Sequence, residues 1–344
     1  MKLATPRWWY TRDLSARKGA MPATRAVLTP ISWIWAAVTA RRIARTVPAT
    51  VGAPVICVGN LTVGGVGKTP VVRALAERLA TQGAPSGGKA VHLLSRGYGG
   101  RLAGPVQVDP TVHSAADVGD EPLMLAADFP VWVARDRAAG AKAAAAAGAD
   151  VIVMDDGHQN PTVRKALSLV VVDGETRGDD WPFGDGRVFP AGPMREPLAA
   201  GLARADAVVM MLPDDLAAPD PELAAMLAGP PLLVAHLKPT APPPAGPQVG
   251  FAGIGKPWKV ARALRAAGCE LADFAEFPDH AAYDEATLKA LADRAAVFEA
   301  GLVTTEKDWA RLPQAWRARV TPWPVAAVFD DPAALDALLA KAGL

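Results

Sequence analysis

Short apolar runs alternate with alanine-rich stretches along the chain from residue 54 onward. Runs that are apolar throughout indicate strands covered by helices on both faces, since a strand with one solvated face alternates apolar and polar residues. Alanine is the strongest helix former, so the stretches between the runs are expected to be helical. The pattern predicts strands at residues 55–58, 91–94, 131–133, 151–154, 169–172 and 207–212, with helices between them, for example at 69–81 and 136–147.

This alternation is typical of an α/β fold with a mostly parallel sheet. The 344 residues are enough for two domains, and the proline-rich stretch 238–247 is the most linker-like part of the chain. Another apolar run at 249–255 and more alternation follow, so a second, smaller α/β lobe is expected to begin between residues 213 and 248. We divide the chain into an N-terminal segment (1–47), a core (48–212) and a second lobe (213–344).

Composition changes this picture mainly at the N-terminus. The chain as a whole is ordinary, with 51% hydrophobic and 21% charged residues, and its two cysteines lie far apart in apolar surroundings, which favours a reducing compartment. Residues 1–46, however, hold nine Lys or Arg and a single acidic residue, a net charge of +8 in a chain whose total is +1. The charged residues of this segment are Lys2, Arg7, Arg12, Asp13, Arg17, Lys18, Arg25, Arg41, Arg42 and Arg45.

The same segment carries an uncharged run of 15 residues between Arg25 and Arg41. As a helix this run would be about 22 Å long, shorter than a hydrocarbon core of roughly 30 Å. Tryptophans beside arginines favour the boundary between lipid headgroups and acyl chains. We therefore predict a membrane-associating helix on an anionic bilayer surface and no nucleic acid partner; a helix packed on the protein's own core is the alternative. The tryptophans are Trp8, Trp9, Trp33 and Trp35.

One segment has the residues and the setting of a phosphate-binding loop. The stretch "TVGGVGKT" follows a predicted strand and opens a predicted helix, and its glycines let backbone N–H groups converge on phosphate at the positive end of the helix dipole. The Lys68 side chain would reach the β- and γ-phosphates, and the Thr69 hydroxyl would bind Mg²⁺. Thr62 stands where the strict pattern has glycine. The predicted loop comprises Thr62, Val63, Gly64, Gly65, Val66, Gly67, Lys68 and Thr69.

Two adjacent aspartates, Asp155 and Asp156, follow the apolar run at 151–154. A carboxylate at the end of a nearby strand is a usual partner of a phosphate loop, because it holds Mg²⁺ directly or through water. Two carboxylates side by side are unfavourable unless a cation neutralises them. Loop and aspartates together predict a P-loop NTPase-like fold that binds ATP or GTP with Mg²⁺.

Two other classes of protein share parts of this pattern. Membrane-associated switch ATPases combine a phosphate loop with an amphipathic helix, but they typically have a lysine in the position of Val63, which crosses a dimer interface to the partner's nucleotide. The valine counts against this class, which stays the alternative function without a lipid substrate. The second class is a soluble small-molecule kinase whose N-terminal helix belongs to the core.

Nine blocks, in order along nearly the whole chain, resemble those of the tetraacyldisaccharide 4′-kinases, the lipid A 4′-kinases of Gram-negative bacteria. The resemblance implies ATP-dependent phosphorylation of the 4′-hydroxyl of a tetraacylated glucosamine disaccharide 1-phosphate, a lipid A precursor, at the cytoplasmic face of the inner membrane. The blocks are the N-terminal segment, "VGNLTVGGVGKTP", "LLSRGYGG", "VGDEPLMLA", "VMDDGHQN", "GRVFPAGPMREP", "GFAGIGKP", "FPDHAAYD" and "VTTEKDWARL".

The resemblance also implies roles for single residues. Asp120 matches the family's catalytic base, although an acidic residue that opens a helix is also a common cap. His280 matches a histidine that cooperates with this base, which would require the two lobes to face each other. Arg195 matches a family arginine and suits phosphate through its planar guanidinium group. The implied catalytic residues are Asp120, His280, Lys68 and Arg195, and the implied metal ligands are Thr69, Asp155, Asp156 and Glu121.

Other positions in these blocks are less specific. Arg96 and Tyr98 follow a predicted strand, where site residues and glycine-supported turns are equally expected. Glu306 and Lys307 would contact the nucleotide, or else belong to a helix capped by one of the threonines before them. Many relatives read Phe-Gln-His after the aspartates where this chain has His158, Gln159 and Asn160, so the role of that family histidine is not carried over.

Overall fold

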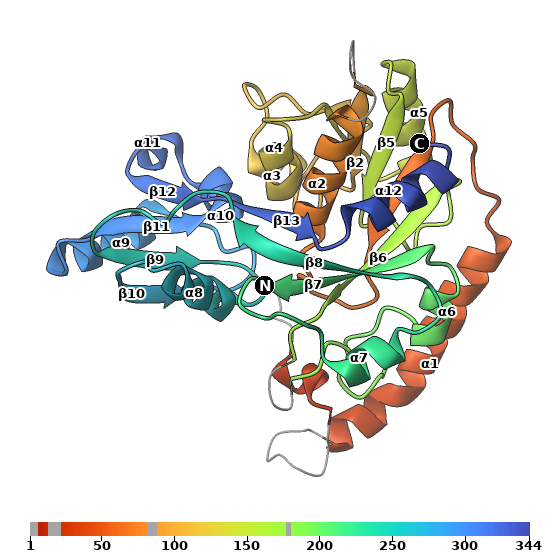
Figure 1. Cartoon of the computed structure of the whole chain (residues 1–344), viewed down its shortest axis with the longest axis horizontal. Helices are drawn as coiled ribbons and strands as arrows, with labels where there is room; N and C mark the ends of the chain where they lie inside the picture. The colour runs from red at the N-terminus through yellow and green to blue at the C-terminus, as the bar shows by residue number, and fades with distance from the viewer. Residues whose placement is uncertain (1–5, 13–21, 82–87, 177–179) are drawn as a thin grey trace.

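The computed structural model describes residues 6–12, 22–81, 88–176 and 180–344. In this part of the chain nine strands form one large sheet, in the order β13-β8-β7-β6-β1-β5-β2-β4-β3 (Figure 1). Neighbours are parallel except at the two edges, where β13 and β3 run antiparallel to their partners. The strands are β1 (Val55–Gly59), β2 (Val91–Ser95), β3 (Val106–Gln107), β4 (Val131–Val133), β5 (Val151–Asp155), β6 (Leu167–Asp173), β7 (Ala207–Pro213), β8 (Leu232–Pro239) and β13 (Val325–Phe329).

The six strands predicted from apolar runs are all present and form the centre of this sheet. Every residue of β1, β5 and β6 is buried, because helices cover both faces. Alternate residues of β1 face opposite layers: Ile56 and Val58 pack with α2 (Lys68–Thr81) and α12 (Pro332–Lys341), whereas Val55 and Cys57 pack with α5 (Arg137–Ala146). Farther along the second face lie α6 (Leu198–Leu202) and α7 (Pro221–Met226).

A second, smaller sheet of four parallel strands has the order β10-β9-β11-β12. It lies to the left of the large sheet in Figure 1, beyond the carboxyl ends of β6 and β7. Its strands are β9 (Gln248–Ala252), β10 (Leu271–Glu276), β11 (Gly301–Thr305) and β12 (Val320–Trp323). Its helices are α8 (Pro257–Ala266), α9 (Glu285–Val297), α10 (Glu306–Arg311) and α11 (Gln314–Arg317).

The boundary between the two sheets differs from our division at residue 213. Strands β8 and β13 lie within 213–344, yet both pair in the large sheet, because β8 extends the parallel order beside β7 and β13 closes that edge. The small sheet therefore spans residues 248–323, and the chain crosses between the sheets at 240–247 and again between β12 and β13. The first crossing coincides with the proline-rich stretch predicted as a linker.

The N-terminal segment forms a short 3-10 helix, η1 (Arg7–Tyr10), and a long helix, α1 (Pro22–Arg45), along the outside of the large lobe (Figure 1). Helix α1 has buried polar side chains and exposed apolar ones, the reverse of the usual pattern. Arg25, Ser32 and Thr39 recur every seven residues on one face and are buried against the protein. The apolar side chains of Val27, Ile31, Trp33, Ile34, Trp35 and Val38 are exposed.

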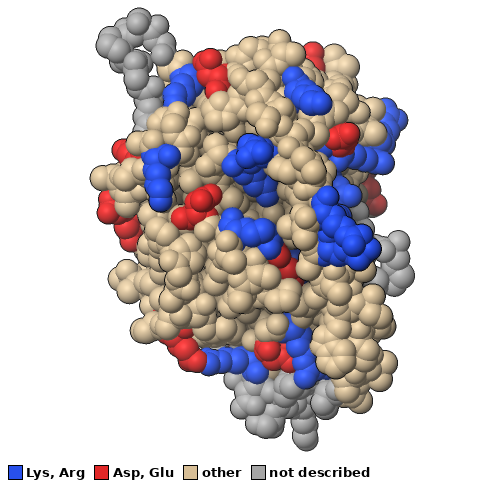
Figure 2. Space-filling view, turned by 90° about the vertical axis from the view of Figure 1, so that its right-hand side faces the viewer, with Lys and Arg blue, Asp and Glu red and all other residues tan. Residues whose placement is uncertain are grey.

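Helix α1 thus lies against the protein through a polar face, and its apolar side chains are not part of the protein's core. Within the described ranges, no helix is long and apolar enough to cross a membrane. Figure 2 shows the right-hand side of Figure 1: basic side chains gather over the middle of this face, with broad uncharged surface around them. Lys2, Asp13, Arg17 and Lys18 of the N-terminal segment lie outside the described residues.

Buried carboxylates of the large lobe meet basic residues of the small lobe. Asp173, at the end of β6, accepts hydrogen bonds from Lys256 at 2.7 Å and from Lys259 at 2.7 Å. Glu175 pairs with Lys259 at 3.0 Å and with Arg262. Burial alone would raise the pKa of Asp173, but the two ammonium groups outweigh burial and hold that pKa below its usual value. This cluster joins the lobes through charge.

We expect Asp173→Asn to lower the free energy of unfolding at pH 7 by roughly 2–3 kcal/mol. A fully buried pair would lose about 3–5 kcal/mol, but the two lysines are 28% and 26% exposed. Because the folded state lowers the pKa of Asp173, its contribution is present above about pH 4 and is lost as the pH falls further. Guanidinium unfolding at pH 7, 5 and 3.5 should therefore show that the free energy of unfolding falls less steeply with decreasing pH in the variant than in the parent.

The matched control is Asp214→Asn, because its pair with Lys238 is half exposed on both sides. That change should lower the free energy of unfolding by less than about 0.5 kcal/mol. Equal losses for the two variants would contradict a stabilising role for the cluster around Asp173.

Candidate active site

The predicted phosphate loop lies between β1 and the start of α2, as the sequence indicated. Gly64 and Gly67 have positive φ angles, of 109° and 87°, which only glycine adopts without strain. A Cβ on Gly67 would also lie 3.3 Å from the Met211 side chain of β7. Among the described residues, no group accepts a hydrogen bond from the backbone N–H groups of 64–67. The loop thus has the geometry for binding phosphate oxygens through the backbone.

The small lobe approaches this loop directly. A Cβ on Gly255 would lie 3.5 Å from the backbone nitrogen of Gly65, so the turn between β9 and α8 lies over the phosphate loop. The two segments are thus close to van der Waals contact. A phosphate held by the loop would therefore lie between the two lobes.

Asp155 and Asp156 stand at the end of β5 beside the loop, but their surroundings differ. Asp156 Oδ1 accepts a hydrogen bond from Arg195 at 2.7 Å and lies 3.5 Å from Lys68 Nζ. Burial opposes its ionisation, yet the charges of Lys68 and Arg195 prevail and hold its pKa below the usual range. Burial and the nearby negative charge of Glu121 instead raise the pKa of Asp155 to about 7.

The residues present suit a divalent cation at Asp155. Its Oδ1 is buried and, within the described chain, has no hydrogen-bond partner, which is unfavourable for a carboxylate unless a cation is bound. Glu121 is near enough to perturb it electrostatically. No group of three acidic, histidine or cysteine side chains in the described ranges could hold a metal alone. This fits Mg²⁺, which takes one or two carboxylates together with substrate phosphates and water.

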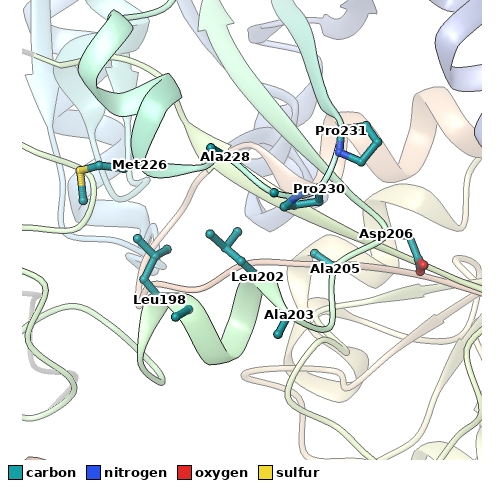
Figure 3. A pocket seen from close by; sticks show the side chains of 11 residues that line it. Leu198, Leu202, Ala203, Ala205, Asp206, Met226, Ala228, Pro230 and Pro231 are labelled. Atoms are coloured by element: carbon teal, nitrogen blue, oxygen red, sulfur yellow. The ribbon is translucent and has the colours of Figure 1, made fainter.

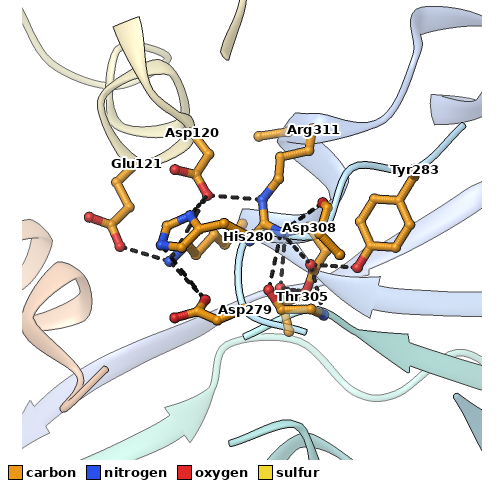
Figure 4. Close-up of polar contacts among 12 residues, drawn as sticks. Asp120, Glu121, Asp279, His280, Tyr283, Thr305, Asp308 and Arg311 are labelled. Atoms are coloured by element: carbon orange, nitrogen blue, oxygen red, sulfur yellow. Dashed lines mark hydrogen bonds and ion pairs between the residues drawn. The ribbon is translucent and has the colours of Figure 1, made fainter. Parts of the chain in front are cut away.

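Asp120 and His280 meet across the two lobes (Figure 4). His280 Nδ1 lies 3.0 Å from Asp120 Oδ2, although the residues are 160 positions apart in the chain. Asp120 opens α4 (Asp120–Leu125) and is buried, after Gly119 with a φ of 94°. His280 has a φ of 58°, a backbone conformation uncommon outside glycine. The ring of Tyr98 lies 5.4 Å from that of His280, centroid to centroid.

Two cations of the small lobe also reach Asp120. Arg311 Nε lies 2.9 Å from Asp120 Oδ2, and Lys307 Nζ lies 2.9 Å from Glu121 Oε1 and 4.0 Å from Asp120 Oδ2. Lys307 was expected either to contact the nucleotide or to belong to a capped helix, and Arg311 was not predicted as a site residue. The signal was present, because positions four apart in "EKDWAR" share one face of a helix.

A buried aspartate holds Arg311 in place (Figure 4). Asp308 is fully buried and pairs with Arg311 Nη1 at 3.2 Å. It also accepts hydrogen bonds from the Tyr283 hydroxyl at 2.7 Å, the Thr305 hydroxyl at 2.6 Å and the Gly253 backbone at 3.0 Å. Both oxygens of this carboxylate are thereby used. Arg311 Nη1 also donates to the Gly253 carbonyl at 3.1 Å and the Ala281 carbonyl at 3.3 Å, so the guanidinium group is held from one side while its Nε faces Asp120.

The charges around Asp120 decide its protonation. Burial would raise its pKa, but the hydrogen bond with His280 and the charges of Lys307 and Arg311 together hold that pKa well below its usual range. Asp120 is therefore an anion at neutral pH, while Asp155 titrates near neutrality. The surroundings of these two carboxylates thus shift their pKa values in opposite directions.

The remaining predicted residues divide between the site and the scaffold. Glu306 pairs with Arg73 of α2 at 3.0 Å, and Thr305 caps α10 by accepting from the Asp308 backbone, so the capping interpretation holds there. Arg195 Nε donates to the Thr62 carbonyl at 2.9 Å, next to its pair with Asp156. His158 is buried between Ser168 Oγ and the Gly201 carbonyl, both at 3.0 Å, and has a structural role.

A separate apolar hollow of about 610 Å³ lies at the opposite edge of the large sheet (Figure 3). Leu198 and Leu202 of α6 line it on one side and Pro230 and Pro231 on another. Asp206 and Pro231 directly precede β7 and β8, so this hollow lies at the amino ends of the strands. The phosphate loop and its partners lie at the carboxyl ends, and the hollow is no part of their site.

Comparison with known proteins adds three relatives. A family model described as Tetraacyldisaccharide-1-P 4'-kinase matches residues 24–343. The tetraacyldisaccharide 4'-kinase of Phenylobacterium zucineum is 72% identical over 98% of this chain and 99% of the relative. That of Caulobacter vibrioides strain NA1000 is 68% identical over 100% of both chains, and that of Maricaulis maris is 51% identical over 97% of this chain and 95% of the relative.

One solved structure has the same fold. It is described as the "apo" form of LpxK from Aquifex aeolicus in complex with ATP, and it matches with a TM-score of 0.72 at 24% identity. The match covers 93% of this chain and 99% of that one. It confirms the predicted P-loop α/β fold.

Proposed function

The chain belongs to the tetraacyldisaccharide-1-P 4'-kinase family and is an ATP-dependent lipid kinase of lipid A biosynthesis, and from this premise we propose how its site works. The acceptor is the 4′-hydroxyl of a tetraacylated glucosamine disaccharide 1-phosphate. The observation that supports this most directly is that Asp120 of the large lobe is met by His280, Lys307 and Arg311 of the small lobe. We infer that this anionic carboxylate can accept a proton near a terminal phosphate held by the loop.

Residues 62–69 bind the phosphates of ATP in this proposal. Backbone N–H groups of 64–67, without partners in the described chain, face the phosphate oxygens. Lys68 and Arg195 both lie beside Asp156 at the mouth of the loop, so their charges can follow the negative charge that develops on the transferred group. Phosphoryl transfer needs little covalent chemistry from the protein, and positioning with charge neutralisation supplies most of the rate.

Asp155, Thr69 and Glu121 are the residues that would hold Mg²⁺. The unpartnered buried oxygen of Asp155 supports it as the main protein ligand, while Asp156 serves to orient Lys68 and Arg195. A bound Mg²⁺ supplies charge neutralisation of the phosphates.

Asp120 accepts the proton of the attacking hydroxyl, and His280 holds the carboxylate in position. A carboxylate with a lowered pKa is a weak base in the ground state. It suffices here, because in a loose transition state the hydroxyl becomes strongly acidic only late, as its bond to phosphorus forms. Lys307 and Arg311 keep the carboxylate ionised until that moment.

Helix α1 brings the enzyme to its lipid substrate at the cytoplasmic face of the inner membrane. Its exposed apolar side chains, flanked by arginines, suit the boundary between acyl chains and anionic headgroups. The helix is also tied to the site, because Trp35 Nε1 donates to the Arg195 carbonyl at 3.2 Å. A lipid headgroup at the surface would thus lie near the phosphate-transfer end of the loop.

Lys68→Ala should reduce transfer of labelled γ-phosphate to the disaccharide by at least about a hundredfold, because it removes a charge that stabilises the transferred group. Product formation by thin-layer chromatography measures it. Lys142→Ala, on the exposed face of α5, should keep the parent's rate. A Lys68 variant as active as the Lys142 variant would refute the proposed phosphate loop.

Asp120→Asn is expected to lower kcat by about 10²–10⁴-fold, the usual contribution of a general base. Affinity for an ATP mimic should stay within about twofold, because Asp120 does not contact the loop. Steady-state kinetics and calorimetric titration separate these two effects. An unchanged kcat would mean that another group accepts the proton.

The double change Trp33→Gln with Ile34→Gln should weaken sedimentation with anionic vesicles by about tenfold, because it removes apolar area from the lipid contact. These side chains are 69% and 64% exposed, so thermal stability should not change. Val112→Gln removes an equally exposed apolar side chain elsewhere and is the control. Equal vesicle binding by all three proteins would show that α1 is not the membrane contact.

A further inference from the structure

The N-terminal segment touches the phosphate site at a point that membrane attachment does not require. The hydroxyl of Tyr10, in η1, donates a hydrogen bond to the Val63 carbonyl at 2.6 Å. A Cβ on Gly64 would lie 3.0 Å from the same hydroxyl. Tyr10 therefore packs directly on the first residues of the loop, 53 positions ahead of Val63 in the chain.

Three successive backbone carbonyls at the start of this loop accept hydrogen bonds from side chains. The Asn60 amide donates to the Thr62 carbonyl at 2.8 Å and to the Gly64 carbonyl at 3.4 Å. Tyr10 holds the carbonyl between them. In a trans peptide the C=O and the following N–H point in opposite directions. Holding the Val63 carbonyl outward therefore turns the Gly64 N–H toward the side where phosphate would bind.

Tyr10 is itself fixed from several directions. Its carbonyl accepts a hydrogen bond from the Trp181 backbone at 2.8 Å, and Lys256 Nζ of the small lobe lies 5.7 Å from its ring centroid. Burial, with the charge of Asp173, raises the pKa of Tyr10 to about 12, so the hydroxyl keeps its proton and remains a donor. The residue joins the N-terminal segment, the phosphate loop and the small lobe.

The residues around Tyr10 hold the loop that leads to Arg195. Trp9 is buried and donates to the Pro190 carbonyl at 3.1 Å, and its ring meets Phe189 edge to face. Trp35 of α1 contacts Phe189 as well, with centroids 5.0 Å apart. Arg25 is fully buried and pairs with Asp185 at 2.5 Å. The N-terminal segment is thus packed into the catalytic lobe next to its nucleotide site.

We propose that Tyr10 is a positioning residue for ATP. Its hydroxyl holds the Val63–Gly64 peptide so that the Gly64 N–H faces the phosphates, and the N-terminal segment completes the nucleotide site in addition to contacting the membrane. This inference rests on the proposed binding of ATP at residues 62–69.

Tyr10→Phe tests the inference, because it removes one hydroxyl and keeps the ring. Affinity for a nonhydrolysable ATP mimic with Mg²⁺, measured by calorimetry on the full chain in detergent, should fall about fivefold, the usual effect of one hydrogen bond. The KM for ATP should rise by a similar factor while kcat and the KM for the lipid stay within about twofold. Amide hydrogen exchange in a peptide covering residues 59–69 should become faster.

Arg12→Gln is the matched control, since Arg12 lies two residues farther in the same segment and pairs with Glu222 at the surface. This variant should keep the parent's affinity for the ATP mimic and the parent's rate of amide hydrogen exchange in residues 59–69. The inference is overturned if Tyr10→Phe binds the ATP mimic as tightly as Arg12→Gln. This holds even if the melting temperature of Tyr10→Phe falls. Undiminished binding of the mimic by Lys68→Ala would instead reject the ATP site itself, which separates the two failures.

Discussion

Buried carboxylates of the large lobe need positive partners, and the small lobe supplies them. Asp120 faces Lys307 and Arg311, while Asp173 faces Lys256 and Lys259. Neither carboxylate would remain ionised at this depth without those cations, because desolvation alone raises the pKa of a carboxyl group. These ion pairs therefore link the two lobes, and the predicted phosphate loop lies where the turn between β9 and α8 approaches it.

The same interface separates the tasks of neighbouring acidic groups. Asp120 and Asp156 are surrounded by cations and stay ionised, whereas Asp155 has a buried oxygen without a protein partner and a pKa of about 7. Separation of pKa values by environment is how one site combines a proton acceptor with a group suited to a metal ion. Asp308 adds a supporting layer, because its four contacts direct Arg311 toward Asp120.

Helix α1 reverses the usual relation between polarity and burial. Its buried side chains are an arginine, a serine and a threonine, and its exposed ones include tryptophan and isoleucine. An exposed apolar face of this kind is typical of a surface that contacts another apolar phase, such as a bilayer. Its inner contacts, through Trp35 and through η1, reach the backbone of Arg195 and of the phosphate loop. The proposed lipid contact and the proposed nucleotide site are therefore joined through the N-terminal segment.

The fold class, the six central strands, and the positions of the glycine-rich loop and of the aspartates at the end of β5 could be predicted from the sequence. These features depend on neighbouring residues: an apolar run makes a covered strand, and a glycine-rich turn between strand and helix makes a phosphate loop. Resemblance to a family added Asp120 and His280 but no geometry. Only the tertiary structure decided that β8 and β13 extend the large sheet, that Arg311 reaches Asp120, and that Tyr10 holds Val63. Each of these depends on contacts between distant parts of the chain. The shared helix face of Lys307 and Arg311 can be read from the sequence, but the carboxylate that they meet cannot.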